Sequence, residues 1–73
     1  MKIKVVKNVY LVCKKDGSLE LQYGSDYLHT PNAKERNSEI KDISLLPDVV
    51  EVFYLKHVVD SIEVDESVLG GLI

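Results

Sequence analysis

The alternation of hydrophobic and polar residues predicts more strand than helix in this chain. Residues 2–14 are apolar at both parities, which is typical of a strand covered at least partly on each face. Asn8 interrupts the pattern and indicates a bulge or a break in the strand. One parity carries Ile3, Val5, Val9, Leu11 and Cys13, and the other carries Val6, Tyr10 and Val12.

A β-hairpin is predicted where Asp16-Gly17 separates this stretch from the alternating residues 18–23. A two-residue loop would place Val12 opposite Leu21, whereas a three-residue loop with a glycine bulge would place Leu11 opposite Leu21. We favour the three-residue loop, because it gathers the apolar side chains on one face of the sheet. The expected core face then consists of Ile3, Val5, Val9, Leu11, Leu19, Leu21 and Tyr23, with Glu20 and Gln22 on the opposite face.

A helix is predicted after the loop that follows the hairpin. Thr30 is suited to cap a helix over residues 31–46, which begins at one proline and is stopped by the next. Asn37 or Ser38 would equally cap a shorter helix. In either case residues 35–41 are expected to form a charged face in solvent.

The last third of the chain predicts two further strands. Residues 49–55 are apolar at both parities, which is typical of the central strand of a sheet. Asp60-Ser61 separates them from a short alternating strand at residues 62–64, and Asp65 is suited to cap a following helical turn. The prediction is a single α+β domain over residues 1–73, with one helix packed on a mixed or antiparallel sheet of three or four strands in the order β-β-α-β-β.

Size and composition are typical of a small globular domain. The 73 residues suffice for one domain, and the hydrophobic share of 45% argues against disorder. Cys13 is the one cysteine, so no intrachain disulfide can form, and the first residues contain no apolar run of signal-peptide length. No stretch approaches the roughly 20 apolar residues of a membrane helix. We therefore expect a cytoplasmic protein that does not bind a membrane.

Charge is distributed unevenly beneath the net value of −3. Residues 1–15 contain lysines and no acid, whereas residues 60–73 contain acids and no base. These two ends could be adjacent strands with opposite charges facing one another, or the lysines could contact a phosphate backbone. We favour the pairing of strands, because the lysines fall on both faces of the predicted strand and no arginine lies among them.

The residues needed for catalysis or metal binding are few and widely spaced. Cys13, His29 and His57 are isolated from one another, and no compact metal-ligand spacing occurs. Ser25, Asp26 and His29 lie in one predicted loop, where adjacent residues seldom reach the geometry of a catalytic triad. Cys13 falls on the parity expected to be buried, as a small hydrophobic residue. We therefore predict no catalytic residue, metal ligand, cofactor or small-molecule substrate, and we expect that the protein is not an enzyme.

Two segments are suited to contact a partner. One is the tyrosine-bearing loop, because tyrosine combines a large apolar area with a polar tip, and the other is the apolar C-terminus. Both could instead dock on the domain's own core. The prediction is a protein-interaction module, acting as an inhibitor, adaptor or accessory protein, that binds another protein or its own twin as a homodimer. The proposed contact residues are Tyr27, Leu28, His29, Val68, Leu69, Leu72 and Ile73.

Two alternative functions remain open at this point. A nucleic-acid-binding domain would use the N-terminal lysines. The strand and helix order, the early hairpin with a glycine bulge and the near-terminal Gly70-Gly71 resemble the β-grasp family of ubiquitin-like and sulfur-carrier proteins. That resemblance implies a carrier whose glycines end the mature chain, so Leu72 and Ile73 would have to be removed by processing.

Overall fold

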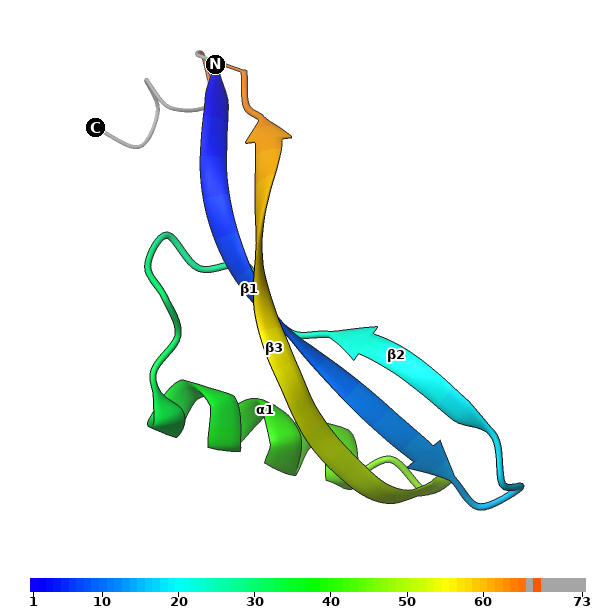
Figure 1. Ribbon diagram of the computed structural model, residues 1–73. Helices are drawn as coiled ribbons and strands as arrows, with labels where there is room; N and C mark the ends of the chain where they lie inside the picture. The colour runs from blue at the N-terminus through cyan, green and yellow to red at the C-terminus, as the bar shows by residue number, and fades with distance from the viewer. Residues whose placement is uncertain (66, 68–73) are drawn as a thin grey trace.

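The computed structural model describes residues 1–65 and 67, and they form a small α+β domain (Figure 1). The elements follow in the order β1 (Lys2–Lys14), β2 (Leu19–Tyr23), α1 (Ala33–Ser44) and β3 (Val49–Glu63). The three strands form one antiparallel sheet in the order β2-β1-β3. The predicted fold class, with a single helix packed on an antiparallel sheet, is confirmed.

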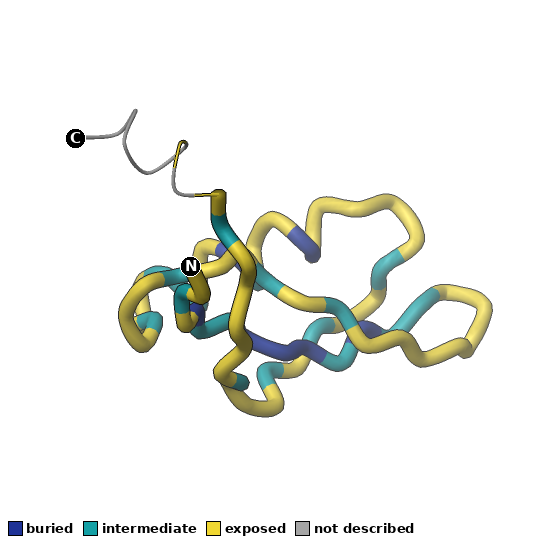
Figure 2. The backbone as a smooth tube through the Cα atoms, turned by 90° about the horizontal axis from the view of Figure 1, so that it is seen from above, coloured by how far each residue is buried: buried dark blue, intermediate teal, exposed yellow. Residues whose placement is uncertain are grey.

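β1 is the central strand, and the prediction that residues 49–55 would be central is wrong. Both neighbours pair with β1, whereas within residues 1–65 β3 pairs with β1 alone. Tyr10 and Val12 of β1 are completely buried, while most of β3 is exposed. Figure 2 shows that buried stretches make up only a small part of the described backbone. The apolar residues at both parities of β3 therefore reflect one face against the helix and one face in solvent.

The hairpin between β1 and β2 has the predicted three-residue register. Leu11 lies opposite Leu21, and Cys13 lies opposite Leu19. Gly17 adopts a φ of 86°, a left-handed conformation that favours glycine, and its N–H donates to the carbonyl of Lys14 at 3.0 Å.

β3 continues without interruption through Asp60-Ser61, so the predicted separate strand at residues 62–64 is wrong and the order is β-β-α-β. Ser61 pairs with Lys4, and its N–H also donates to the carboxylate of Asp60 at 2.8 Å. Asp60 and Ser61, which were expected to form a turn, thus bond to each other within the strand. The ladder between β1 and β3 has two bulges, and both lie in β3 rather than at Asn8, where one was expected. Val50 and Leu55 each have no partner between two consecutive pairs of the ladder.

The helix begins later than predicted, because Asn32 and not Thr30 is its N-cap. The side chain of Asn32 accepts a 2.9 Å bond from the N–H of Glu35, and the Glu35 carboxylate accepts one from the N–H of Asn32 at 3.1 Å. This reciprocal capping box satisfies two free N–H groups at once. The other candidate caps, Thr30, Asn37 and Ser38, could not form such a box, because none of them has a glutamate three residues later. The helix ends at Ser44, before Pro47.

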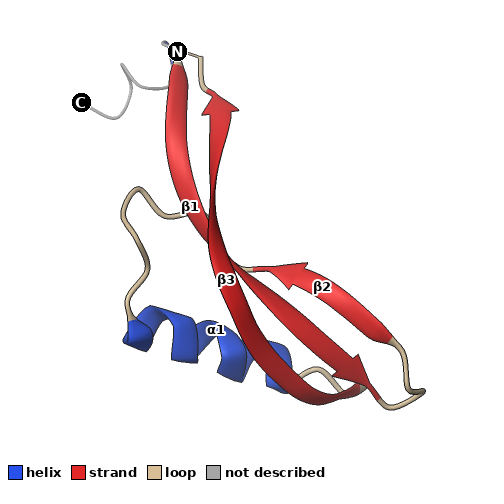
Figure 3. Cartoon of the chain, in the orientation of Figure 1, coloured by secondary structure: helices blue, strands red, loops and turns tan. Residues whose placement is uncertain are grey.

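The helix covers only part of the sheet, as Figure 3 shows. Beyond α1, β1 and β3 continue as a two-stranded ribbon to the N-terminus, where the N–H of Val64 donates to the carbonyl of Met1 at 2.8 Å. The loop between β2 and α1 returns along β1, and Tyr27 exchanges two 2.8 Å backbone bonds with Val6. The molecule is consequently elongated, with extents of 46 × 22 × 19 Å.

The core lies on the face of the sheet opposite to the one predicted. Ile43 of α1 packs against Tyr10 and Val12, together with partly buried residues of α1 and β3. Because side chains alternate along a strand, this face also carries Glu20 and Gln22 of β2. Val5 and Val9 of the expected core face are buried, but Leu19, Leu21 and Tyr23 are exposed. The predicted register is right, whereas the predicted core face is right at Val5 and Val9 and wrong at Leu19, Leu21 and Tyr23.

Candidate functional site

The loop predicted to contact a partner splits into one anchored residue and two exposed ones. Tyr27 is half-buried and is fixed to Val6 through its backbone. Leu28 is 79% exposed, and His29 is also exposed. The rings of Tyr27 and His29 lie 5.5 Å apart at an angle of 58°. Leu28 is therefore the one residue of the three that offers an isolated apolar surface.

His29 is held at the start of the helix by Glu35. Its Nε2 lies 3.0 Å from Oε1 of Glu35. The bond with His29, together with the N–H of Asn32, lowers the pKa of the Glu35 carboxyl. The imidazole thus extends the capping box, and this local structural role accounts for its position. The predicted contacts Val68, Leu69, Leu72 and Ile73 lie outside the described residues, as do Gly70 and Gly71.

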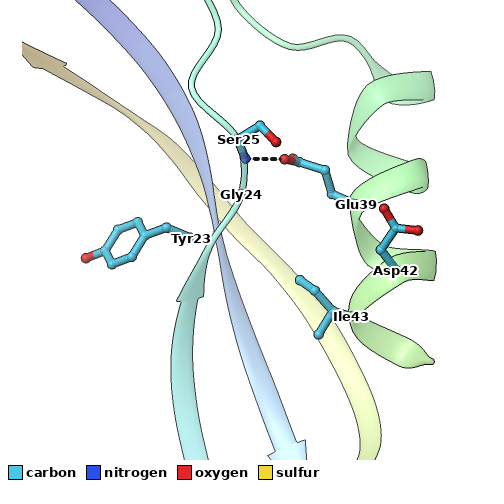
Figure 4. A pocket seen from close by; sticks show the side chains of 6 residues that line it. All are labelled: Tyr23, Gly24, Ser25, Glu39, Asp42 and Ile43. Carbon is cyan, nitrogen blue, oxygen red and sulfur yellow. Dashed lines mark hydrogen bonds between the residues drawn. The ribbon is translucent and has the colours of Figure 1, made fainter. Parts of the chain in front are cut away.

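A buried carboxylate, Glu39, was missed by the sequence analysis, which expected residues 35–41 to form a solvated face. Glu39 is 9% exposed and points from α1 toward the sheet. Its Oε1 accepts hydrogen bonds from the amide of Asn8 at 2.9 Å and from the hydroxyl of Tyr10 at 2.8 Å. Its Oε2 accepts one from the N–H of Ser25, drawn in Figure 4. The sequence signal is Asn8, a polar residue in an apolar strand that needs a partner when it is buried.

The Glu39 cluster holds β1 and the loop after β2 against α1 through hydrogen bonds. Burial and the bond to Glu39 raise the pKa of the Tyr10 hydroxyl, so this group stays protonated and donates. Burial and the charge of Glu39 also raise the pKa of Tyr27. No described buried side chain has an unsatisfied polar atom. Both oxygens of Glu39 therefore already accept hydrogen bonds from the protein itself.

A hollow of about 300 Å³ lies beside this cluster, between the end of β2 and α1 (Figure 4). Its polar groups are the satisfied Glu39, the backbone near Ser25 and the exposed Asp42. No group of three histidine, cysteine or acidic residues could hold a metal ion in the part of the chain that the structure describes. The hollow is lined by Tyr23, Gly24, Ser25, Glu39, Asp42 and Ile43.

Another feature is the sheet face that α1 does not cover, which we call the open face. Exposure is 64% for Leu19, 56% for Leu21 and 46% for Phe53. These residues are neighbours, because Leu11 lies opposite both Leu21 and Phe53 and Cys13 lies opposite Leu19. Cys13, expected to be buried, is only half-buried here. The open face consists of Leu11, Cys13, Leu19, Leu21, Tyr23 and Phe53.

The two ends of the open face carry opposite charges. Glu51 lies opposite Cys13 at one end, and Lys56 lies opposite Val9 at the other. At the same basic end, the ammonium group of Lys7 lies 5.2 Å from the centre of the Tyr23 ring. Glu51 and Lys56 are both exposed, and neither forms an ion pair within residues 1–65. The face is thus an apolar surface with an acidic end and a basic end.

The N-terminal lysines face acids of β3, as the strand-pairing interpretation predicted. Lys2 lies opposite Glu63, and the ammonium group of Lys7 is 3.3 Å from the carboxylate of Asp60. At the other end of β1, Lys14 is 2.9 Å from Asp48, and their bond lowers the pKa of the Asp48 carboxyl. These exposed pairs align strands and contribute little free energy individually.

Comparison of the chain with protein-family models, with curated protein sequences and with solved structures finds no match. Among the residues that are described, no helix has the length and apolar character needed to cross a membrane. The residues themselves therefore carry the functional argument.

Proposed function

We propose that the protein acts by binding another protein chain through the open face. The observation that carries the proposal is the contiguity of Leu21, Leu11 and Phe53 across all three strands, with both edge positions about half-exposed. Monomeric proteins seldom expose contiguous apolar patches of this kind unless the patch is functional. An aromatic and aliphatic centre with charges at its border is the usual anatomy of a protein interface.

Two features favour protein over nucleic acid as the partner. The open face is apolar, with Glu51 at one end and Lys56 at the other, whereas a phosphate backbone requires a predominantly basic surface. Lys7 and Lys14 already face Asp60 and Asp48. A catalytic function is not favoured either, because both oxygens of the Glu39 carboxylate already accept hydrogen bonds from Asn8, Tyr10 and Ser25.

Substitutions on the open face and on other exposed apolar residues test the proposal. Leu21→Lys places a charge in the centre of the face, Leu28→Lys tests the loop, and Val59→Lys is a matched control on the ribbon, where Val59 is 63% exposed. Association is measured by light scattering of the pure protein and by quantitative affinity capture. We expect Leu21→Lys to abolish association while Leu28→Lys and Val59→Lys retain it.

Two results would reject the proposal. One is loss of association in Leu28→Lys with full retention in Leu21→Lys, which would move the interface to the loop. The other is a chain that associates with nothing at any concentration. Circular dichroism of each variant separates lost binding from lost folding.

A further inference from the structure

We infer that the partner of the open face is a second copy of this chain, packed face to face with its strands running in the opposite direction. This inference rests on the proposed function, because it assigns an occupant to the same surface. Its evidence is the distribution of charge on β3.

Glu51 and Lys56 lie on one strand, on either side of Phe53, and both belong to pairs on the open-face side of the sheet. Five residues of strand separate them by about 16 Å, so they cannot pair with each other in one chain. A two-fold axis near Phe53 that runs across the strands would exchange the two ends. Glu51 of each copy then lies over Lys56 of the other, and two ion pairs border the apolar centre.

The other face-to-face arrangement is electrostatically unfavourable. A two-fold axis parallel to the strands keeps both copies in the same direction, so Glu51 faces the acidic end and Lys56 faces the basic end of its partner. Like charges opposed across an interface disfavour association. Strands of packed sheets lie within about 30° of alignment, an offset that long lysine and glutamate side chains can span.

Pairing through a sheet edge is a weaker alternative. β2 offers only five residues at its edge. β3 offers a longer edge, but it contains bulges at Val50 and Leu55 and several charged residues. Bulges and charges are devices that prevent edge-to-edge pairing. The open face has neither at its centre.

A charge-reversal cycle measured by sedimentation equilibrium tests the arrangement. We expect the native chain to dimerise and each single reversal, Glu51→Lys or Lys56→Glu, to weaken the dimer roughly tenfold, because two ion pairs become two repulsions. The double variant Glu51→Lys/Lys56→Glu restores both pairs with the signs exchanged, and we expect its dissociation constant to return to near the native value. Lys34→Glu, at an exposed position of α1, is the control and should leave the dissociation constant unchanged.

The outcomes separate this inference from the proposed function. The antiparallel arrangement would be overturned if the dimer of the double variant were weakened by the sum of the free-energy losses of the two single reversals. A chain that stays monomeric, yet captures another protein in a manner abolished by Leu21→Lys, would overturn the dimer and keep the function. A monomer with no association dependent on Leu21 would overturn both, and docking of the chain's own C-terminal residues on the face would give that result.

Discussion

The hydroxyl group of Tyr10 donates a 2.8 Å hydrogen bond to Oε1 of Glu39, joining the central strand to the helix. Asn8, two residues earlier on the same face of β1, donates to the same oxygen at 2.9 Å. Both donors are buried, and a buried donor without a partner costs about 1–3 kcal/mol. The helix therefore covers the face that carries Asn8 and Tyr10, and the more apolar face stays open.

Removal of the Glu39 carboxylate is expected to destabilise the domain strongly. Glu39→Ala leaves the side chain of Asn8 and the N–H of Ser25 without an acceptor, and it leaves the Tyr10 hydroxyl only its long 3.4 Å bond to the carbonyl of Arg36. We expect a loss of about 3 kcal/mol in the free energy of unfolding. Urea denaturation measures the change. Asp42→Ala, one turn along the helix at an exposed position, is the control and should alter stability by less than about 0.5 kcal/mol. Equal effects of the two substitutions would show that Glu39 carries no special role.

Stability is expected to fall at alkaline pH through Tyr10. Its pKa is raised in the folded protein, whereas the unfolded chain ionises near the ordinary value of 10.0. The contribution is fully present below pH 10 and is lost as pH rises toward the raised pKa, with a slope of up to about 1.4 kcal/mol per pH unit. The free energy of unfolding is measured for the native chain and for Tyr10→Phe from neutral to strongly alkaline pH. The difference between the two pH profiles gives the contribution of Tyr10. Parallel pH profiles for the two chains would contradict the assignment.

Gly24 is required by the close approach of Glu39. A Cβ at Gly24 would overlap the Glu39 carboxylate, so Gly24→Ala should cost about 1–3 kcal/mol through forced repacking. In a Glu39→Ala background the same substitution should cost clearly less, because the obstructing atoms are gone. A double-mutant cycle by thermal unfolding checks this coupling, and purely additive effects would argue against it.

The observed core face and the core face expected from the sequence predict opposite stability effects for substitutions at Val12 and Leu21. Val12→Ala removes methyl groups from a fully buried site and should cost about 2 kcal/mol. Leu21→Lys changes a side chain that is 56% exposed, and in dilute protein its effect should stay within about 0.5 kcal/mol. Denaturant unfolding at low protein concentration compares them. If Leu21→Lys proved the more damaging, the sequence-based choice of core face would be correct after all.

Local signals in the sequence predicted most of the fold. Asp16-Gly17 predicted the hairpin and its register, because the turn geometry is set by a few residues. The apolar patterns predicted strands at residues 2–14, 18–23 and 49–55, but they split β3 at Asp60-Ser61, where the strand is continuous. The proline before the last strand marked the end of the helical region. The helix cap was misplaced because Asn32 and Glu35 act as a reciprocal pair, and only the spacing between them reveals it.

The parity of the apolar residues could not identify the open face. Alternation shows which residues share a face, but it does not show which face a helix covers when both are apolar. The deciding contacts join Asn8 and Tyr10 to Glu39, 31 and 29 residues away along the chain. A rule that a buried Asn must find a partner would have pointed to the correct face.

Phe53 is the one phenylalanine of the chain and lies at the centre of the open face, next to the inferred two-fold axis. Incorporation of fluorophenylalanine therefore gives a single ¹⁹F resonance that reports on this surface alone. Raising the protein concentration from micromolar to millimolar should shift that resonance and remove its sensitivity to exchange between H2O and D2O, and Leu21→Lys should prevent both changes. A ¹⁹F resonance that stays solvent-sensitive and unshifted over the whole range would contradict burial of the open face against a second copy.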